Sequence, residues 1–108
     1  MIKGTNTAES AIVFKERVHA WAAKVRARPK QVRLQAMKRK WASCSTEGRV
    51  TFSLDLLDEA SSFQDYVIVH ELIHLKVPNH GKLFSSLLAA HLPGYKHMSR
   101  PEAKSRSL

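Results

Sequence analysis

Apolar residues recur every three or four positions in the first part of the chain. Phe14, Val18 and Val25 belong to this repeat, and charged residues fill the positions between. Such spacing gathers apolar side chains on one face of an α-helix. We therefore expect an amphipathic helix over about residues 7–27. It ends before Pro29, because proline disfavours helical backbone at the residue that precedes it.

From residue 31 the pattern changes to an alternation of apolar and polar positions. Val32 and Leu34 alternate with polar neighbours, as is typical of a strand with one face in water. Residues 49–53 predict a second strand. The two are expected to form a β-hairpin over about residues 31–53, with Gly48 in the turn at a position that requires positive φ.

Two further helices are predicted in the second half of the chain. The first, over about residues 62–77, is apolar nearly all round and is therefore expected to be central and buried. The second spans about residues 80–91, with four side chains directed inward: Leu83, Phe84, Leu87 and Leu88. A basic tail, 95–108, follows. The pattern predicts a small single α+β domain over residues 1–108, with helices packed on a short sheet that contains antiparallel strands.

The central predicted helix contains His70-Glu71-Leu72-Ile73-His74, an H-E-x-x-H motif. Residues four apart lie on one face of a helix, so the two imidazoles can bind one metal ion. Glu71 lies beside them, where it can take a proton from a water molecule. Ordinary core histidines are the weaker interpretation, because an unpaired glutamate in an apolar helix is costly to bury.

A third histidine, His80, follows the motif after five intervening residues. A catalytic zinc ion needs three protein ligands and an open fourth position. The predicted set is therefore His70, His74 and His80, which bind one Zn²⁺ per chain. His80 could instead be a surface histidine near the break between two helices, in which case His91 or His97 would replace it.

The positive charge of the chain is concentrated in one window. The formal net charge is +9, and residues 17–46 contain nine basic residues and no acidic one. An anionic partner is one interpretation: nucleic acid, an acidic peptide or another polyanion. Lys38, Arg39 and Lys40 are the candidate contacts. The alternative is a solvated basic face that keeps the protein soluble.

Composition favours a cytoplasmic protein. The first residues lack the apolar core of a signal peptide, and no stretch approaches the ~18 apolar residues of a membrane span. Cys44 is the one cysteine, so no disulfide within the chain is expected. Cys44 could be a fourth metal ligand, a nucleophile or a small packing residue. Packing is the favoured interpretation, because no Cys-His catalytic pattern accompanies it.

With these residues in place, the chain resembles the YgjP-like metallopeptidase domain family, metal-dependent hydrolases related to SprT-like proteases. The resemblance covers about residues 32–97. It rests on Met37–Ser45, Gly48–Leu57, Tyr66–Leu75, Asn79-His80, Phe84 and His91–Tyr95. Where the family usually has Trp-Gly-Ser-Cys, this chain has alanine at position 42, and we expect that change to reshape the turn.

The resemblance implies a zincin fold, with the active-site cleft between the sheet and the motif helix. It implies the same three zinc ligands, Glu71 as general base, and hydrolysis of a peptide or protein substrate. Tyr95 is a candidate contact to the oxyanion or the substrate. The strand 49–53 could pair with an extended substrate as an added strand.

Two other functions fit the same residues. One is a binding module, stabilised by zinc, that uses its basic face for nucleic acid or a protein complex with little turnover. The other is a hydrolase of a non-peptide amide. Glu71 separates the binding module from the enzyme, because a purely structural metal site has no need of a carboxylate beside the ion.

Overall fold

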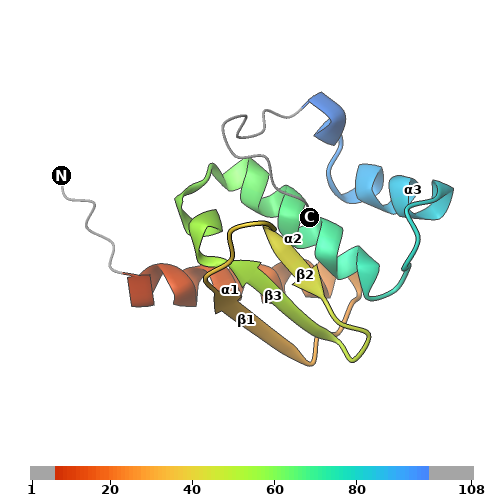
Figure 1. The fold of residues 1–108 in the computed structure, drawn as a ribbon. Coiled ribbons are helices and arrows are strands. Elements are labelled where there is room, and N and C mark those ends of the chain that lie inside the picture. Colours follow the sequence, from red (N-terminus) through yellow and green to blue (C-terminus); the bar gives the residue numbers. More distant parts are fainter. Residues whose placement is uncertain (1–6, 98–108) are drawn as a thin grey trace.

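The structure, a computed structural model, describes residues 7–97 (Figure 1). Within that range three α-helices, three strands and two short 3₁₀ helices follow one another. In chain order they are α1 (Thr7–Val25), β1 (Gln31–Gln35), β2 (Ala42–Cys44), β3 (Arg49–Ser53), η1 (Leu54–Asp58), α2 (Ser61–His74), α3 (Lys82–His91) and η2 (Tyr95–His97). Most of the predicted basic tail lies outside the described residues.

The strands form one mixed sheet in the order β1-β3-β2. β1 pairs with β3 in parallel, with Gln31 opposite Arg49. β2 pairs with β3 in antiparallel fashion, with Ala42 opposite Phe52. The prediction that the strands now labelled β1 and β3 form a hairpin is therefore wrong. The hairpin is formed by β2 and β3, and the segment between β1 and β2 carries the chain from one edge of the sheet to the other.

Gly48 closes the β2–β3 hairpin as predicted. Its φ is +94°, a region that only glycine enters without strain. A side chain at this position would also meet Lys30, because an ideal Cβ would lie 3.2 Å from Lys30 Cγ. The backbone N–H of Lys30 donates to the Gly48 carbonyl at 2.8 Å. The turn is thus held against the segment that leads into β1.

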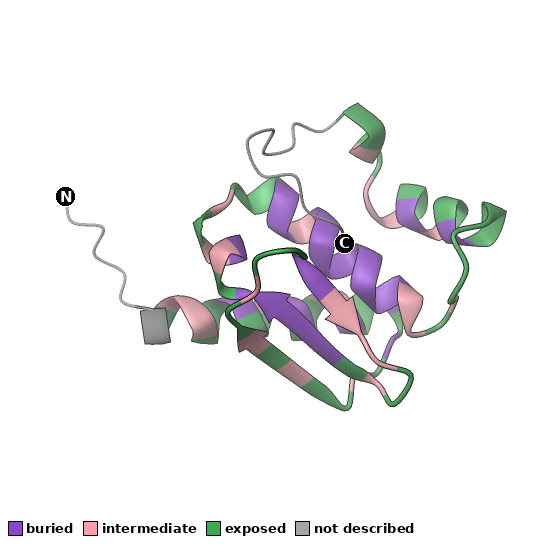
Figure 2. Cartoon of the chain, viewed as in Figure 1, coloured by how far each residue is buried: buried purple, intermediate pink, exposed green. Residues whose placement is uncertain are grey.

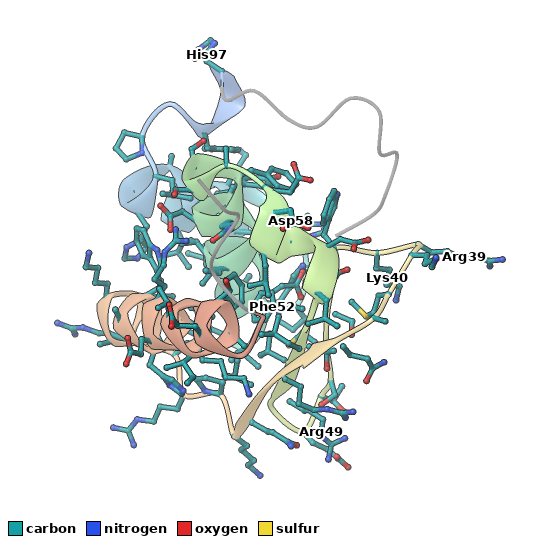
Figure 3. All side chains as sticks on the ribbon, turned by 90° about the vertical axis from the view of Figure 1, so that its left-hand side faces the viewer. Arg39, Lys40, Arg49, Phe52, Asp58 and His97 are labelled. Atoms are coloured by element: carbon teal, nitrogen blue, oxygen red, sulfur yellow. The ribbon has the colours of Figure 1, made fainter. Side chains whose placement is uncertain are left out.

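The core lies between the sheet and the two longer helices. β3 is the central strand, and its residues 50–53 are all buried. Phe52 points from β3 toward α1 and meets the ring of Phe14 edge-on, with 5.1 Å between centroids (Figure 3). Figure 2 shows that α2 and β3 are buried along most of their length, whereas β1 is largely exposed. The predicted α+β fold with the motif on a central buried helix is confirmed.

The helix ends differ from the prediction by a few residues. α2 stops at His74, before the predicted end near Val77. α3 begins at Lys82, so His80 lies in the loop between the two helices rather than on the last helix. Leu83 is 61% exposed and does not point inward as predicted, while Phe84 and Leu88 are buried. No helix within residues 7–97 is long and apolar enough to cross a membrane.

Candidate metal centre

Three histidines converge where α2 ends and the loop to α3 begins. His70 and His74 lie one turn apart on α2, and His80 comes from the loop. One ring nitrogen from each lies within 4.8 Å of those of the other two. The closest pair is Nε2 of His74 and Nε2 of His80, 2.7 Å apart. Neither His91 nor His97 joins this group among the described residues.

The three nitrogens fit a single bound ion. Imidazole nitrogens at about 2.0–2.1 Å from a tetrahedral ion are about 3.3 Å from one another. The spacings between the three rings bracket that value, at 2.7 Å for one pair and within 4.8 Å for all. The three histidines could therefore hold one ion, and the set offers nitrogen donors only.

Neighbouring groups orient the rings of the first two histidines. Nδ1 of His70 lies 3.3 Å from Oε2 of Glu71, which leaves Nε2 as the ligand atom. The ring of His74 hydrogen-bonds to the Pro78 backbone carbonyl. Such partners fix the tautomer and orientation of metal-binding histidines. Burial, followed by the nearby His70, lowers the pKa of His74, so its ring is neutral, as ligation requires.

Phe84 of α3 forms an apolar floor under the three rings. Its centroid lies 5.1 Å from that of His70, 4.8 Å from that of His74 and 4.6 Å from that of His80. The side chain is 3% exposed. The sequence identified Phe84 as an inward residue but not as a neighbour of the three histidines. Its packing restricts all three rings at once, so it is a positioning residue for the site.

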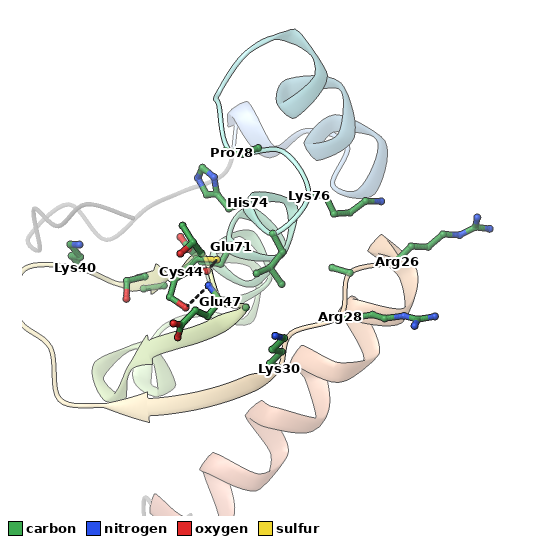
Figure 4. A pocket seen from close by; sticks show the side chains of 17 residues that line it. Arg26, Arg28, Lys30, Lys40, Cys44, Glu47, Glu71, His74, Lys76 and Pro78 are labelled. Atoms are coloured by element: carbon green, nitrogen blue, oxygen red, sulfur yellow. Dashed lines mark hydrogen bonds between the residues drawn. The ribbon is translucent and has the colours of Figure 1, made fainter.

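Glu71 is a buried carboxylate on the wall of a cleft. Glu71 as a whole is 2% exposed, yet it lines an open cleft of about 870 Å³ together with His74 and Cys44. Figure 4 shows Glu71 and Cys44 side by side, with His74 above them. Burial, and then the nearby Glu71, raises the pKa of the Cys44 thiol. Cys44 is therefore a protonated thiol at neutral pH, which agrees with a packing role rather than a nucleophile.

Other sequence-predicted residues are divided between the cleft and the outer surface. Lys40 lines the cleft, whereas Lys38 and Arg39 do not, and Arg39 points outward from the loop before β2 (Figure 3). The three therefore do not share the cleft, and their contact with a polyanion stays a prediction. Tyr95 also lies outside the cleft lining. Its ring stacks on that of Tyr66 with 6.1 Å between centroids, and its contact with an oxyanion stays a prediction.

β2, not β3, forms the edge of the sheet at the cleft. β3 lies between β1 and β2, so its backbone groups are paired on both sides and the predicted addition of a substrate strand to 49–53 is wrong. Trp41 and Ser45, the residues that flank β2, are hydrogen-bonded to β3. The Ser53 N–H donates to the Trp41 carbonyl, and the Ser45 N–H donates to the Arg49 carbonyl. Because antiparallel bonding alternates, the backbone groups of Ala42 and Cys44 face the outer edge.

Comparison with known proteins agrees with this geometry. The chain is similar to the crystal structure of the metallopeptidase zymogen of Pyrococcus abyssi abylysin, with 22% identity and a TM-score of 0.67 over 75% of this chain and 81% of that one. The corresponding values for the metallopeptidase zymogen of Methanocaldococcus jannaschii jannalysin are 25%, 0.67, 73% and 81%. No curated protein gives a significant match.

Fold and comparisons together define the class of protein as a metallopeptidase. The model of the YgjP-like metallopeptidase domain matches residues 2–101 of the chain. The chain therefore belongs to the YgjP-like metallopeptidase domain family, and the resemblance carried by the sequence motifs is confirmed.

Proposed function

We propose that this metallopeptidase uses one zinc ion bound by His70, His74 and His80, with Glu71 as general base. The observation that carries the proposal is the convergence of three imidazoles beside a buried carboxylate on the wall of an open cleft. Zinc is the metal that such a set of neutral nitrogen donors favours, and three protein ligands leave a position for water or substrate.

The chemistry that zinc supplies in such a site is a water whose pKa falls to about 7 and a polarised substrate carbonyl. Glu71 takes the proton from the attacking water and later delivers it to the leaving amine. His70 holds the carboxylate in place through its Nδ1 contact.

Within residues 7–97 no further strand pairs with the outer edge of β2, and this edge supports a way to orient the substrate. The backbone groups of Ala42 and Cys44 face outward, and both residues line the cleft that contains Glu71 and His74. An extended peptide that pairs with this edge presents its main chain to the metal centre. Main-chain hydrogen bonds bind many sequences alike, so side-chain preferences must come from other walls of the cleft.

A zinc-stabilised binding module is the less favoured alternative. A structural metal site gains nothing from a carboxylate that is 2% exposed and lies at an open cleft, because burying that charge opposes folding. Catalysis supplies a reason to retain it.

The test is to incubate the zinc-loaded protein with casein and with a mixture of short peptides. We expect cleavage that is absent from the Glu71→Gln variant, which keeps the shape of the side chain but removes the base. The matched control is Asp65→Asn, a substitution on the same helix but outside the cleft lining, which also changes a carboxylate to an amide. Equal cleavage by wild type and Glu71→Gln would refute the proposal.

A further inference from the structure

We propose that the cleft selects peptides that carry carboxylates on both sides of the bond to be cleaved, an inference that rests on the proposed function. Arg26, Arg28 and Lys30 would bind the carboxylate at one end of the cleft, and Lys40 the one at the other. The inference names a class of substrate, acidic peptides, and the residues that select it.

The cleft is lined by an excess of basic side chains. Its basic residues are Arg26, Arg28, Lys30, Lys40 and Lys76, and its acidic residues are Glu47 and Glu71. Lys76 is already engaged, because its Nζ donates to the Val25 carbonyl at 3.2 Å. Glu47 lies 3.8 Å from the guanidinium of Arg49.

The other four cations are available to a ligand. Arg26, Arg28, Lys30 and Lys40 are all exposed. None of them forms a salt bridge within residues 7–97. Unpaired charges of one sign on the walls of a cleft raise the local concentration of oppositely charged ligands. The basic residues of the cleft lining therefore outnumber the acidic ones, and neither Glu47 nor Glu71 forms a salt bridge with any of these four cations.

The four cations occupy two ends of the cleft. Figure 4 shows Lys40 on one side of Glu71 and His74, and Arg26, Arg28 and Lys30 on the other. The chain explains this division: Lys40 precedes β2, whereas Lys30 is hydrogen-bonded to Gly48 in the turn that follows β2. A peptide paired with the edge of β2 would run from one group to the other, past the metal centre.

Arg26 stands at a position that favours glycine. It follows the last residue of α1, and its φ is +63°. The next residue, Ala27, donates its N–H to the Ala22 carbonyl at 3.0 Å, the bond of a Schellman helix end, whose left-handed residue is usually glycine. An arginine here is strained, and it puts a long basic side chain at the rim of the cleft, where it extends away from Glu71 and His74 (Figure 4). Strain of this kind concentrates at functional sites.

The position of the cations favours a peptide over nucleic acid. They lie in the same cleft as Glu71 and His74, at the two ends and not along an outer surface. Lys38 and Arg39, the neighbours of Lys40 in sequence, do not line the cleft. An extended peptide of a few residues, at ~3.3 Å per residue, matches such a short, divided arrangement.

The test uses quenched fluorescent peptides with a neutral cleaved sequence, in which glutamate or glutamine replaces each position in turn. We expect glutamate to raise kcat/KM about 3- to 10-fold over glutamine at positions on both sides of the cleaved bond, because charge-assisted contacts to partly exposed arginine or lysine are of this strength. The preference should shrink between low salt and 0.5 M salt.

Two substitutions locate the preference. Arg28→Gln should remove it on one side of the cleaved bond, and Lys40→Gln on the other. The matched controls are Arg33→Gln and Lys38→Gln, which remove the same charges outside the cleft and should leave the preference unchanged. Peptides with free and amidated C-termini distinguish a side-chain carboxylate from the terminal one, and we expect internal glutamate to suffice.

Three results would overturn the inference while leaving the proposed function intact. The first is equal cleavage of the glutamate and glutamine peptides. The second is that Arg28→Gln and Lys40→Gln remove the glutamate preference on the same side of the cleaved bond, and the third is that the control variants reduce it equally. Inhibition by a single-stranded oligonucleotide through Arg28 and Lys40, without a preference for glutamate, would assign the cleft to nucleic acid instead. If the proposed function fails, the result is distinct from these, because the wild type then cleaves no peptide or cleaves as much as Glu71→Gln does. Binding of the same peptide pairs, measured by fluorescence anisotropy, would still decide the charge preference.

Discussion

Helix α2 contains two acidic residues, Asp65 and Glu71, in very different surroundings. The side chain of Asp65 is 28% exposed and pairs with Arg17 of α1. It also accepts a hydrogen bond of 2.9 Å from Nε1 of Trp21. Glu71 is 2% exposed, and within residues 7–97 its one close polar partner is the ring of His70 at 3.3 Å.

The difference separates a structural carboxylate from one available for chemistry. Asp65 joins α1 to α2 through Arg17, which also donates hydrogen bonds to Gln64 and to the Ser61 carbonyl. Glu71 is more deeply buried, and within residues 7–97 no lysine or arginine forms a salt bridge with it. A buried carboxylate without such a partner is a candidate functional group.

The largest expected effect distinguishes the two carboxylates directly. Glu71→Gln should lower kcat for peptide cleavage by about 10²–10⁴-fold, the usual contribution of a general base. Asp65→Asn should leave kcat within about twofold, because Asp65 is outside the cleft lining and substitutions away from a site have small effects. Steady-state kinetics on one peptide measure both. Similar losses in the two variants would show that Glu71 acts only through stability.

The second prediction concerns the loop ligand. His80→Ala should weaken zinc binding by more than the about 10–100-fold that loss of an outer-shell partner costs. His91→Ala, which removes a histidine at the end of α3, should leave it unchanged. Competition with a chromophoric chelator gives the affinities. Full occupancy in His80→Ala would remove His80 from the ligand set.

Metal removal should affect the two ends of α2 unequally. A ligand at 100 times its Kd stabilises the folded state by about 2.7 kcal/mol, so chelation should lower Tm by about 10 °C for a domain of this size. Hydrogen exchange should accelerate near His74 and His80 and change little near Asp65. An unchanged Tm after confirmed metal loss would show that the core alone fixes this end of the fold.

The smallest effect belongs to the structural carboxylate. Asp65→Asn should lower the free energy of unfolding by about 1 kcal/mol, because the pair with Arg17 is partly exposed and screened by solvent. Urea denaturation measures the change, and Arg17→Met should give a similar loss. A loss above about 3 kcal/mol in either variant would mean that the pair is more important to the core than its exposure indicates.

The sequence predicted the motif helix well because its two signals are local. The spacing of His70 and His74 and the apolar run around them are properties of a single helix. The position of His80 is not a local property, since it lies in a loop whose path depends on where α3 packs. Phe84 gave no signal of its position under the three rings, because an apolar residue in a helix looks the same wherever it is buried.

The sheet was predicted least well. β2 is three residues long, too short to show an alternating pattern, and its Ser43 and Cys44 resemble the turn that follows. The parallel pairing of β1 with β3 then depends on a contact between distant segments that periodicity does not encode. The same limit applies to the cleft: the basic window was visible in the sequence, but which of its residues share one wall is set by the crossing of residues 36–41.

X-ray absorption at the zinc edge of the zinc-loaded protein tests the central claim most directly. The claim is that one ion is bound by three imidazoles with a fourth position open for catalysis. The predicted spectrum has nitrogen and oxygen neighbours at about 2.0–2.1 Å, with the multiple-scattering signature of three imidazoles. A sulfur neighbour at about 2.3 Å would show that Cys44 closes the site, and it would contradict the account.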